Sequence, residues 1–256
     1  MSTPSSPAPA STTVYFITGA SRGIGFGLAE RYASRPDTLV FAGARDPSKA
    51  DKLQQLAKQH KNVRIVQLAV TSDADHQAAA KQVEAEAGRV DVLLANAGIS
   101  NEDAYERVEA LTVDKLRENL EINTIGPVRL FHAFFALLSL SSKPKFVVVS
   151  STLGSQEATA RYPGFHVANY GISKAGVNYF TQRVHIEHPN IISFPLCPGW
   201  VQTDMGAVGA KVAGLKEAPV TLKESVDGIT KLVDSATRET HNGKYFNAPD
   251  GTELPW

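Results

Sequence analysis

Length, composition and charge limit the class of protein. The chain has 256 residues, a size typical of one α/β domain, with 43% hydrophobic and 20% charged residues, enough for a real core. Lys+Arg and Asp+Glu both number 26, so the basic excess usual in nucleic-acid binders is missing. The one cysteine, Cys197, cannot form an internal disulfide, which excludes a disulfide scaffold.

The N-terminal segment differs in composition from the rest. Residues 1–13 are rich in Ser, Thr, Pro and Ala and have neither the basic start nor the apolar centre of a secretory signal. We predict a disordered tail, followed by one domain over residues 14–256 in a cytoplasmic protein. The longest apolar stretch, around 131–140, contains His132 and Ser139. This pattern indicates a buried helix rather than a membrane span.

Short apolar runs alternate along the chain with longer segments of helical spacing. The runs occupy residues 14–18, 39–44, 63–67, 90–95, 146–150, 191–196 and 244–246. Most are continuously apolar, as expected for parallel strands covered on both faces. We therefore predict an α/β fold with a single-domain, doubly wound parallel sheet (Rossmann-type) of about seven strands and helices on both faces.

Capping residues mark several helix ends. Ser72 precedes an alanine-rich segment that stops at Gly88, and Thr221 with Glu224 has the spacing of a capping box. Pro127 lies inside the helical segment 113–138, where we expect a kink or break.

The first strand leads directly into a glycine-rich turn at residues 18–25. Gly19 permits the sharp turn, Gly23 lets the backbone approach a pyrophosphate, and Gly25 lets the next helix pack closely. The N-terminus of that helix offers free N–H groups to phosphates. The order strand, turn, helix favours dinucleotide binding over a turn that serves packing alone. The remaining expected cofactor contacts of this turn are Ser21, Arg22 and Ile24.

The end of the second strand bears on the choice of cofactor. An acidic residue about 20 positions after the last glycine binds the ribose of NAD, but here that position is Arg45. An arginine can pair with the 2′-phosphate of NADP(H), and Arg22 could assist. The alternative is that Arg45 is solvated and Asp46 selects NAD. Because Asp46 precedes Pro47 and has a capping role available, we favour NADP(H).

A tyrosine and a lysine four residues apart suggest proton chemistry. Tyr170 and Lys174 share one face of a predicted helix over 168–187. A fixed positive charge lowers the pKa of a phenol from near 10, as a proton-transfer catalyst needs. Such pairs are usually structural when they stand alone.

Three further features strengthen the catalytic interpretation. Ser150 and Ser151 end the fifth predicted strand, and Asn96 ends the fourth. Both strand ends lie at the sheet edge where doubly wound folds bind ligands. Asn123 lies in the following helix, shortly before Pro127.

Together these motifs resemble the short-chain dehydrogenase/reductase family. The matching positions are the turn 18–25, Asn96-Ala97-Gly98, Asn123, Ser151, Tyr170 with Lys174, and Pro198-Gly199 with Thr203. Within the family, the chain is most similar to sniffer-type carbonyl reductases and fungal norsolorinic acid ketoreductases. The resemblance covers nearly the whole chain beyond the tail and includes its ending at 243–256.

The resemblance implies a role for each catalytic residue. Tyr170 would donate the proton to a carbonyl oxygen, and Lys174 would lower the pKa of Tyr170 and hold the nicotinamide ribose. Ser151 would hydrogen-bond the substrate oxygen, and Asn123 would position a water that links Lys174 to solvent.

The resemblance also implies the rest of the NADP(H) site. Pro198, Gly199, Val201 and Thr203 would line the nicotinamide end, and Val70 and Asn96 the adenosine side, beside Ala97 and Gly98.

Two positions depart from the family pattern. Ala69 stands where an aspartate commonly meets the adenine. The interval from Ser151 to Tyr170 is several residues longer than in many members, so residues 155–166 should form a loop beside the active site. This insertion bears on the choice between Ser150 and Ser151, and we assign Ser151 because it should fall just beyond the strand.

The family resemblance implies that residues 204–219 form a mobile lid over a small-molecule substrate. Phe165, Trp200 and Met205, with Val208, could form an apolar pocket for a bulky hydrophobic or aromatic, polyketide-like ketone. Trp200 and Met205 fit ordinary core positions equally well. We expect neither a membrane nor a nucleic acid as partner, and we expect a homodimer through the segments 113–138 and 168–187.

Other functions fit less well. A serine hydrolase would need Ser151 to stand in a Gly-x-Ser-x-Gly turn, which it does not, and no histidine is clearly placed to serve it. No metal site is expected, since His185 and His188 mark a surface helix end before Pro189. Two alternatives stay open: a dinucleotide-binding sensor without catalysis, and an enzyme that works in the direction of alcohol oxidation.

Overall fold

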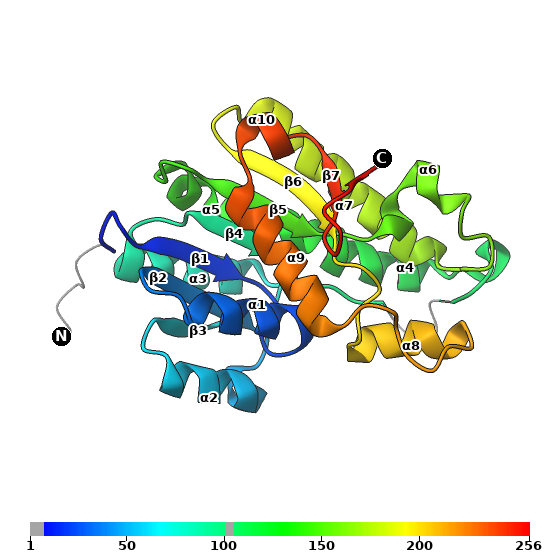
Figure 1. Ribbon diagram of the computed structural model, residues 1–256, viewed down its shortest axis with the longest axis horizontal. Coiled ribbons are helices and arrows are strands. Elements are labelled where there is room, and N and C mark those ends of the chain that lie inside the picture. Colours follow the sequence, from blue (N-terminus) through cyan, green and yellow to red (C-terminus); the bar gives the residue numbers. More distant parts are fainter. Residues whose placement is uncertain (1–7, 101–104) are drawn as a thin grey trace.

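The computed structural model describes residues 8–100 and 105–256. Its centre is an eight-stranded sheet in the order β3-β2-β1-β4-β5-β6-β7-β8, parallel except for β8, which pairs antiparallel with β7 (Figure 1). The strands are β1 (Thr13–Ile17), β2 (Thr38–Ala44), β3 (Val63–Gln67), β4 (Val92–Ala95), β5 (Lys145–Val149), β6 (Ile192–Cys197), β7 (Tyr245–Asn247) and β8 (Glu253–Leu254). The predicted fold class is confirmed, and the seven expected runs all form strands. The two-residue strand β8 was not expected.

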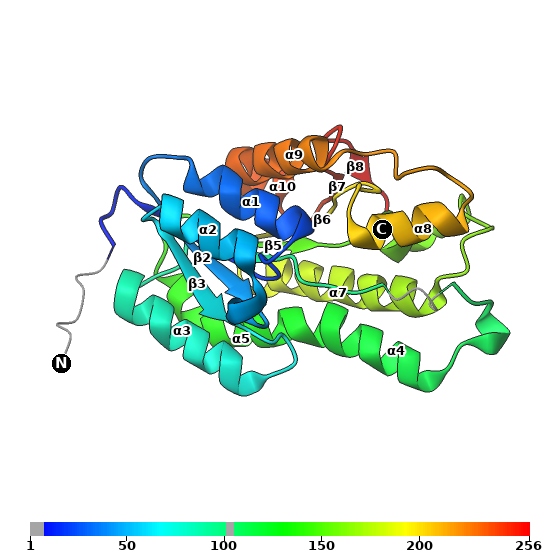
Figure 2. The same ribbon diagram turned by 90° about the horizontal axis from the view of Figure 1, so that it is seen from below.

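Helices cover both faces of the sheet (Figure 2). One face carries α1 (Gly23–Ala33), α2 (Asp51–Gln59) and α9 (Leu222–Ser235), and the other carries α3 (Asp73–Ala87), α5 (Gly126–Ser139) and α7 (Ala168–Glu187). The remaining helices are η1 (Pro47–Lys49), η3 (Val108–Ala110), α4 (Val113–Leu120), η4 (Glu121–Ile125), η5 (Thr152–Gly154), α6 (Gln156–Thr159), α8 (Asp204–Val212) and α10 (Arg238–His241).

The two helical layers explain why the strands are apolar at successive positions. In β1, Tyr15 and Ile17 enter the core under α1, α2 and α9, whereas Val14 and Phe16 enter the core under α3, α5 and α7. Consecutive side chains of a strand point to opposite faces, so a strand covered on both sides needs apolar residues throughout.

The expected caps are present. The Ser72 side chain accepts from the Asp75 N–H at the start of α3, Gly88 ends that helix in the left-handed conformation, and Thr221 and Glu224 form the capping box of α9. At Pro127 the chain does not break. Instead, α4, the π-helix η4 and α5 form one continuous helix from Val113 to Ser139, with Pro127 in the first turn of α5. The π-helix directly before Pro127 is a local departure from α-helical hydrogen bonding, and it accommodates a residue that has no N–H to donate.

This long helix is apolar enough to cross a membrane by length and composition alone. Its side chains at Leu130, Phe134 and Leu138 are at most 1% exposed and lie in the core beneath the sheet. Packing against the sheet therefore accounts for its apolar character.

The N-terminal segment is held more firmly than its composition indicates. The Ala8 N–H bonds the carbonyl of Ala87, and the Arg89 guanidinium donates to the carbonyls of Ala8, Pro9 and Thr12. The predicted tail of residues 1–13 is therefore too long. Residues 8–13 belong to the domain because a distant arginine binds their backbone, and residues 1–7 lie outside the described part.

The strand order reverses between β1 and β4, which creates the crevice typical of ligand binding in doubly wound sheets. Thr18, directly after β1, holds the crevice together: its Oγ1 accepts from the N–H groups of Asn96 at 3.0 Å and Ala97 at 2.9 Å. The carboxyl ends of the strands and the helix α8 lie at the same end of the molecule (Figure 1).

Candidate active site

The glycine turn has the geometry of a phosphate cradle. Gly19 and Gly23 have φ values of 66° and 55°, which disfavour other residues. A Cβ on Gly25 would collide with the Gly19 carbonyl and lie 2.5 Å from Asn96 Nδ2. Helix α1 begins without a side-chain cap or an acidic residue in its first turn. Its N-terminal N–H groups are thus left for an anion, and the turn fits the pyrophosphate of a dinucleotide.

Next to this turn lies a hollow of about 220 Å³ lined by Ser21, Arg45, Asp46 and Lys49. The Asp46 side chain accepts from the Ser48 N–H and caps η1, and Lys49 Nζ lies 3.1 Å from its carboxylate. Hydrogen bonds from Ser48 and Lys49 lower the pKa of Asp46. Asp46 therefore has the capping role expected for it, and two cations line the hollow.

Lys49 was not expected in this site, because nothing in the sequence distinguishes it from other surface lysines. Arg22 takes a different place from the one expected: its guanidinium lies 2.9 Å from the carboxylate of Asp204 at the start of α8. Both side chains are about four-fifths exposed.

The pair expected to be catalytic, Tyr170 and Lys174, lies at the start of α7. Lys174 is 4% exposed; its Nζ donates to the Val149 carbonyl at 2.9 Å and lies 5.6 Å from the centre of the Tyr170 ring. Burial lowers the pKa of Lys174 to about 8. Burial also raises the pKa of Tyr170, and a hydrogen bond with Ser151 opposes this rise in part. In this arrangement the expected lowering of the Tyr170 pKa by Lys174 is absent, because the ammonium is directed at Val149.

The two serines after β5 have different surroundings. Ser150 is 2% exposed and donates to Asn178 Oδ1 at 2.5 Å. Ser151 accepts from the Leu153 N–H at 3.2 Å and faces the Tyr170 hydroxyl. Ser151 is therefore the serine beside the tyrosine, and Ser150 is a core residue. Asn178 was not expected from the sequence.

Asn123 lies in the π-helix η4 and joins three elements. Its Oδ1 accepts from the Ile99 N–H at 2.8 Å, and its Nδ2 donates to the Ile99 carbonyl and to Ser173 Oγ. A Cβ on Gly98 would lie 3.0 Å from Asn123 Oδ1 and 3.4 Å from Lys174 Nζ. Asn123 and Lys174 thus flank the same small space, which Gly98 keeps open. π-Turns frequently mark functional positions in helices.

The residues expected at the nicotinamide end form the base of the segment 201–220. Val201 and Val220 pair in a β-bridge, Gly199 has a φ of 83°, and the Pro198 carbonyl accepts from Ser225. Thr203 caps α8 by accepting from the Gly206 N–H at 3.2 Å. Across the crevice, Val70 packs against Gly126 at the start of α5.

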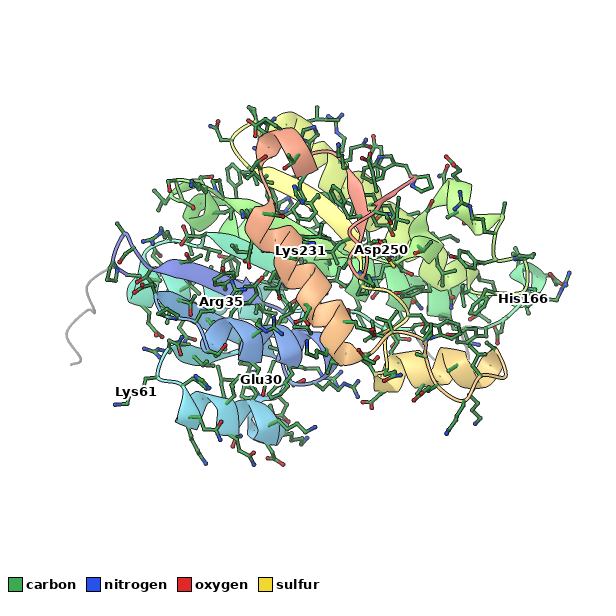
Figure 3. All side chains as sticks on the ribbon, in the orientation of Figure 1. Glu30, Arg35, Lys61, His166, Lys231 and Asp250 are labelled. Atoms are coloured by element: carbon green, nitrogen blue, oxygen red, sulfur yellow. The ribbon has the colours of Figure 1, made fainter. Side chains whose placement is uncertain are left out.

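Two of the four expected substrate residues meet each other. The Phe165 and Trp200 rings lie 5.5 Å apart, edge to face, and Trp200 Nε1 donates to the Gly206 carbonyl. Met205 is 38% exposed and does not join them in the core. His166, next to Phe165, lies at the end of the molecule remote from Arg35 (Figure 3). The insertion and α7 border a second hollow of about 390 Å³, lined in part by Phe165 and Ile172.

Tyr105 also lies at this site and was not expected. It is half-buried, and its hydroxyl lies against Gly209 of α8. No motif includes this position. Over residues 8–100 and 105–256, no group of three His, Cys, Asp or Glu side chains is close enough to hold a metal ion.

Comparisons with known proteins agree with this geometry. The short chain dehydrogenase family model matches residues 13–211. A norsolorinic acid ketoreductase from Dothistroma septosporum is 37% identical over 95% of this chain and 92% of its own. An NADPH-bound carbonyl reductase from chicken fatty liver has a TM-score of 0.86 at 32% identity, covering 96% of this chain and 99% of its own. The carbonyl reductase Sniffer of D. melanogaster has a TM-score of 0.83 at 26% identity, with the same coverage. The resemblance inferred from the motifs is confirmed, and the chain belongs to the short-chain dehydrogenase/reductase family of oxidoreductases.

Proposed function

We propose that the protein is an NADPH-dependent carbonyl reductase that converts a bulky aromatic ketone into an alcohol. The observation that carries this proposal is the meeting of Ser151, Tyr170 and Lys174 with Asn123 at the carboxyl edge of the sheet, beside the uncapped N-terminus of α1. The proposed proton donor, Tyr170, and the glycine turn that would bind the phosphates thus share one crevice.

The hollow beside the glycine turn supports NADP(H) over NAD. Arg45 and Lys49 line it, and Asp46 is engaged with Ser48 and Lys49. Two cations at the hollow suit a 2′-phosphate, for which the arginine offers a forked donor. The chicken carbonyl reductase of similar structure is NADPH-bound, in agreement with this choice.

When bound, NADPH supplies the hydride for the carbonyl carbon. Ser151 then hydrogen-bonds the substrate oxygen, and Tyr170, which burial keeps protonated, gives its hydroxyl proton to that oxygen. Lys174 leaves the Val149 carbonyl and supports the Tyr170 oxygen as it loses its proton. Asn123 fixes the segment after β4 against α7 and so keeps the space beside Lys174 open for a water.

Aromatic side chains favour a flat, bulky substrate. Phe165 and Trp200 pack edge to face, and residues 204–219, called the lid here, follow Trp200 in the chain. The proposal places these two rings in one wall of the substrate site. The relative from Dothistroma septosporum is named a norsolorinic acid ketoreductase, which is in keeping with a ketone substrate.

The proposal includes a homodimer in the cytoplasm. Ile172, Tyr179 and Ile186 are 47%, 66% and 56% exposed and lie seven residues apart, so they form one apolar stripe along α7. Because Ile172 and Ile186 are equally far from Tyr179, two antiparallel copies of α7 would pair them about a two-fold axis.

The exchange of Tyr170 for phenylalanine tests the proposed chemistry. We expect Tyr170→Phe to lower turnover of an aryl ketone at least about a hundredfold while NADPH binding stays intact, since only the proton donor is lost. Turnover is measured as NADPH consumption at 340 nm, and binding as NADPH fluorescence.

The matched control is Tyr179→Phe, which removes an exposed hydroxyl from the same helix. Near-normal turnover in Tyr170→Phe would refute the assignment. Wild-type protein that binds NADPH but reduces no ketone or aldehyde of a broad panel would favour the sensor.

A further inference from the structure

Three segments that are far apart in the sequence converge beside helix α8. Tyr105 follows β4, Phe165 belongs to the insertion before α7, and Trp200 and Gly209 belong to the segment after β6. The first two segments are tied together by the β-bridge between Glu106 and Val167. Tyr105 is thereby anchored next to the insertion.

Gly209 is the meeting point of two of these aromatic residues. A Cβ at this position would lie 2.7 Å from the Tyr105 hydroxyl oxygen and 3.3 Å from both Cζ2 and Nε1 of Trp200. Tyr105 and Trp200 therefore pack against the same spot of α8. A glycine inside a helix is less favourable than alanine, so close contact with the phenol supplies a reason for it.

The lid is closed at its base and exposed over its outer part. The Val201–Val220 bridge is reinforced by hydrogen bonds from the Gln202 N–H to Val220 and from the Val220 N–H to the Trp200 carbonyl. Beyond this base, residues 211–217 are exposed. The contact of Gly209 with Tyr105 is thus a docking point between the lid and the body of the domain.

We propose that the lid helix α8 packs on Tyr105 when the lid is closed. Tyr105 is then a positioning residue that holds the lid over the substrate pocket. The closed pocket then has a wall of three aromatic rings, Tyr105, Trp200 and Phe165, next to Tyr170. This wall selects carbonyl compounds with fused or extended aromatic rings over small aliphatic ones. The inferred substrate class rests on the proposed carbonyl reductase function. The docking of α8 on Tyr105 rests on the geometry alone.

Docking is tested without any activity measurement. Trypsin can cleave the lid after Lys211 and Lys216, both exposed, and cleavage should be slow while α8 is docked. We expect Gly209→Ala to speed cleavage at least about fivefold, because the new methyl group displaces the Tyr105 hydroxyl. Alanine has a higher helix propensity than glycine and by itself would slow cleavage of α8, so faster cleavage would point to the lost contact.

A second substitution distinguishes this contact from general damage. In the double variant Tyr105→Phe/Gly209→Ala the methyl group takes the place of the hydroxyl, so cleavage should return to within about twofold of the wild-type rate. Gly164→Ala is the control, since a Cβ there meets nothing within 4 Å. Wild-type cleavage of Gly209→Ala, or a double variant as labile as Gly209→Ala, would overturn the docking.

Selectivity is tested with 2-acetonaphthone and propanal as substrates. Tyr105→Ala and Gly209→Ala should each lower the ratio of kcat/KM for 2-acetonaphthone over propanal about tenfold, mainly through KM of the naphthone. If the lid is released in these variants but the ratio of kcat/KM for the two substrates is unchanged, the proposed role of the aromatic wall in selectivity is wrong. The proposed function would not be affected by that result. A wild-type protein inactive on every carbonyl would instead overturn the proposed function, and proteolysis would still decide the docking.

Discussion

At the scale of single residues, the catalytic lysine has a protonation state that can change under assay conditions. Lys174 is buried between β5 and α7, and this burial lowers its pKa to about 8 from an ordinary value near 10.4. Burial raises the pKa of Tyr170, so the proton donor itself stays protonated well above that pH. The two groups therefore lose their protons in widely separated ranges.

We expect carbonyl reduction to decline as pH rises through about 8. Below this pH Lys174 is an ammonium that supports the departing charge on Tyr170, and above it this support is lost. The measurement is kcat/KM for an aryl ketone at saturating NADPH from about pH 6 to about pH 10. A profile that stays flat to the upper limit would show that Lys174 keeps its proton in the working enzyme.

Arg45 should decide the cofactor. Arg45→Asp places a carboxylate at the hollow that we assign to the 2′-phosphate, so NADPH is repelled and the ribose hydroxyl of NADH gains an acceptor. We expect the ratio of kcat/KM with NADPH to that with NADH to fall by at least about tenfold. Arg117→Asp, on exposed helix α4, controls for the change in net charge. An unchanged ratio would refute the 2′-phosphate site.

The sequence predicts motif residues well and their neighbours poorly. The glycine turn, Asn96, Asn123, Ser151, Tyr170 and Lys174 all lie around one crevice, because strand ends and helix starts in a doubly wound fold converge by topology. Tyr105 and Lys49 carry no such signal. Tyr105 is placed by the bridge of its neighbour Glu106 to Val167, which is distant in the chain, and Lys49 is the last residue of the short helix η1 that Asp46 caps.

At the scale of elements, strands and capped helices follow from local patterns. Each predicted strand lies within two residues of its observed bounds, since runs of apolar residues must be covered on both faces. The π-helix η4 could not be predicted. Its extra residue is accommodated in a helix that Pro127 was expected to break, and it is held by the hydrogen bonds of Asn123 to Ile99 and Ser173.

At the scale of the whole molecule, the α7 stripe makes an assembly testable. Tyr179→Glu places a charge at the centre of the proposed two-fold contact, where it would face its own copy and lose solvent. We expect the variant to be monomeric when wild-type protein is dimeric, as measured by light scattering on a sizing column. Lys223→Glu, on the exposed side of α9, is the control. A wild-type protein that elutes as a monomer at high concentration would refute the dimer.

The first described residue lies away from the proposed active site, whereas the last one contacts the insertion beside it. Ala8 is bound through Arg89 at the amino end of β1, away from α8 (Figure 1). Trp256, in contrast, accepts a hydrogen bond from the Glu157 N–H of the insertion and packs its ring 5.8 Å from that of Tyr245. An affinity tag is therefore best fused before residue 8. A tag fused after Trp256 would disturb this contact with the insertion that carries Phe165, and we expect it to weaken the proposed substrate selectivity.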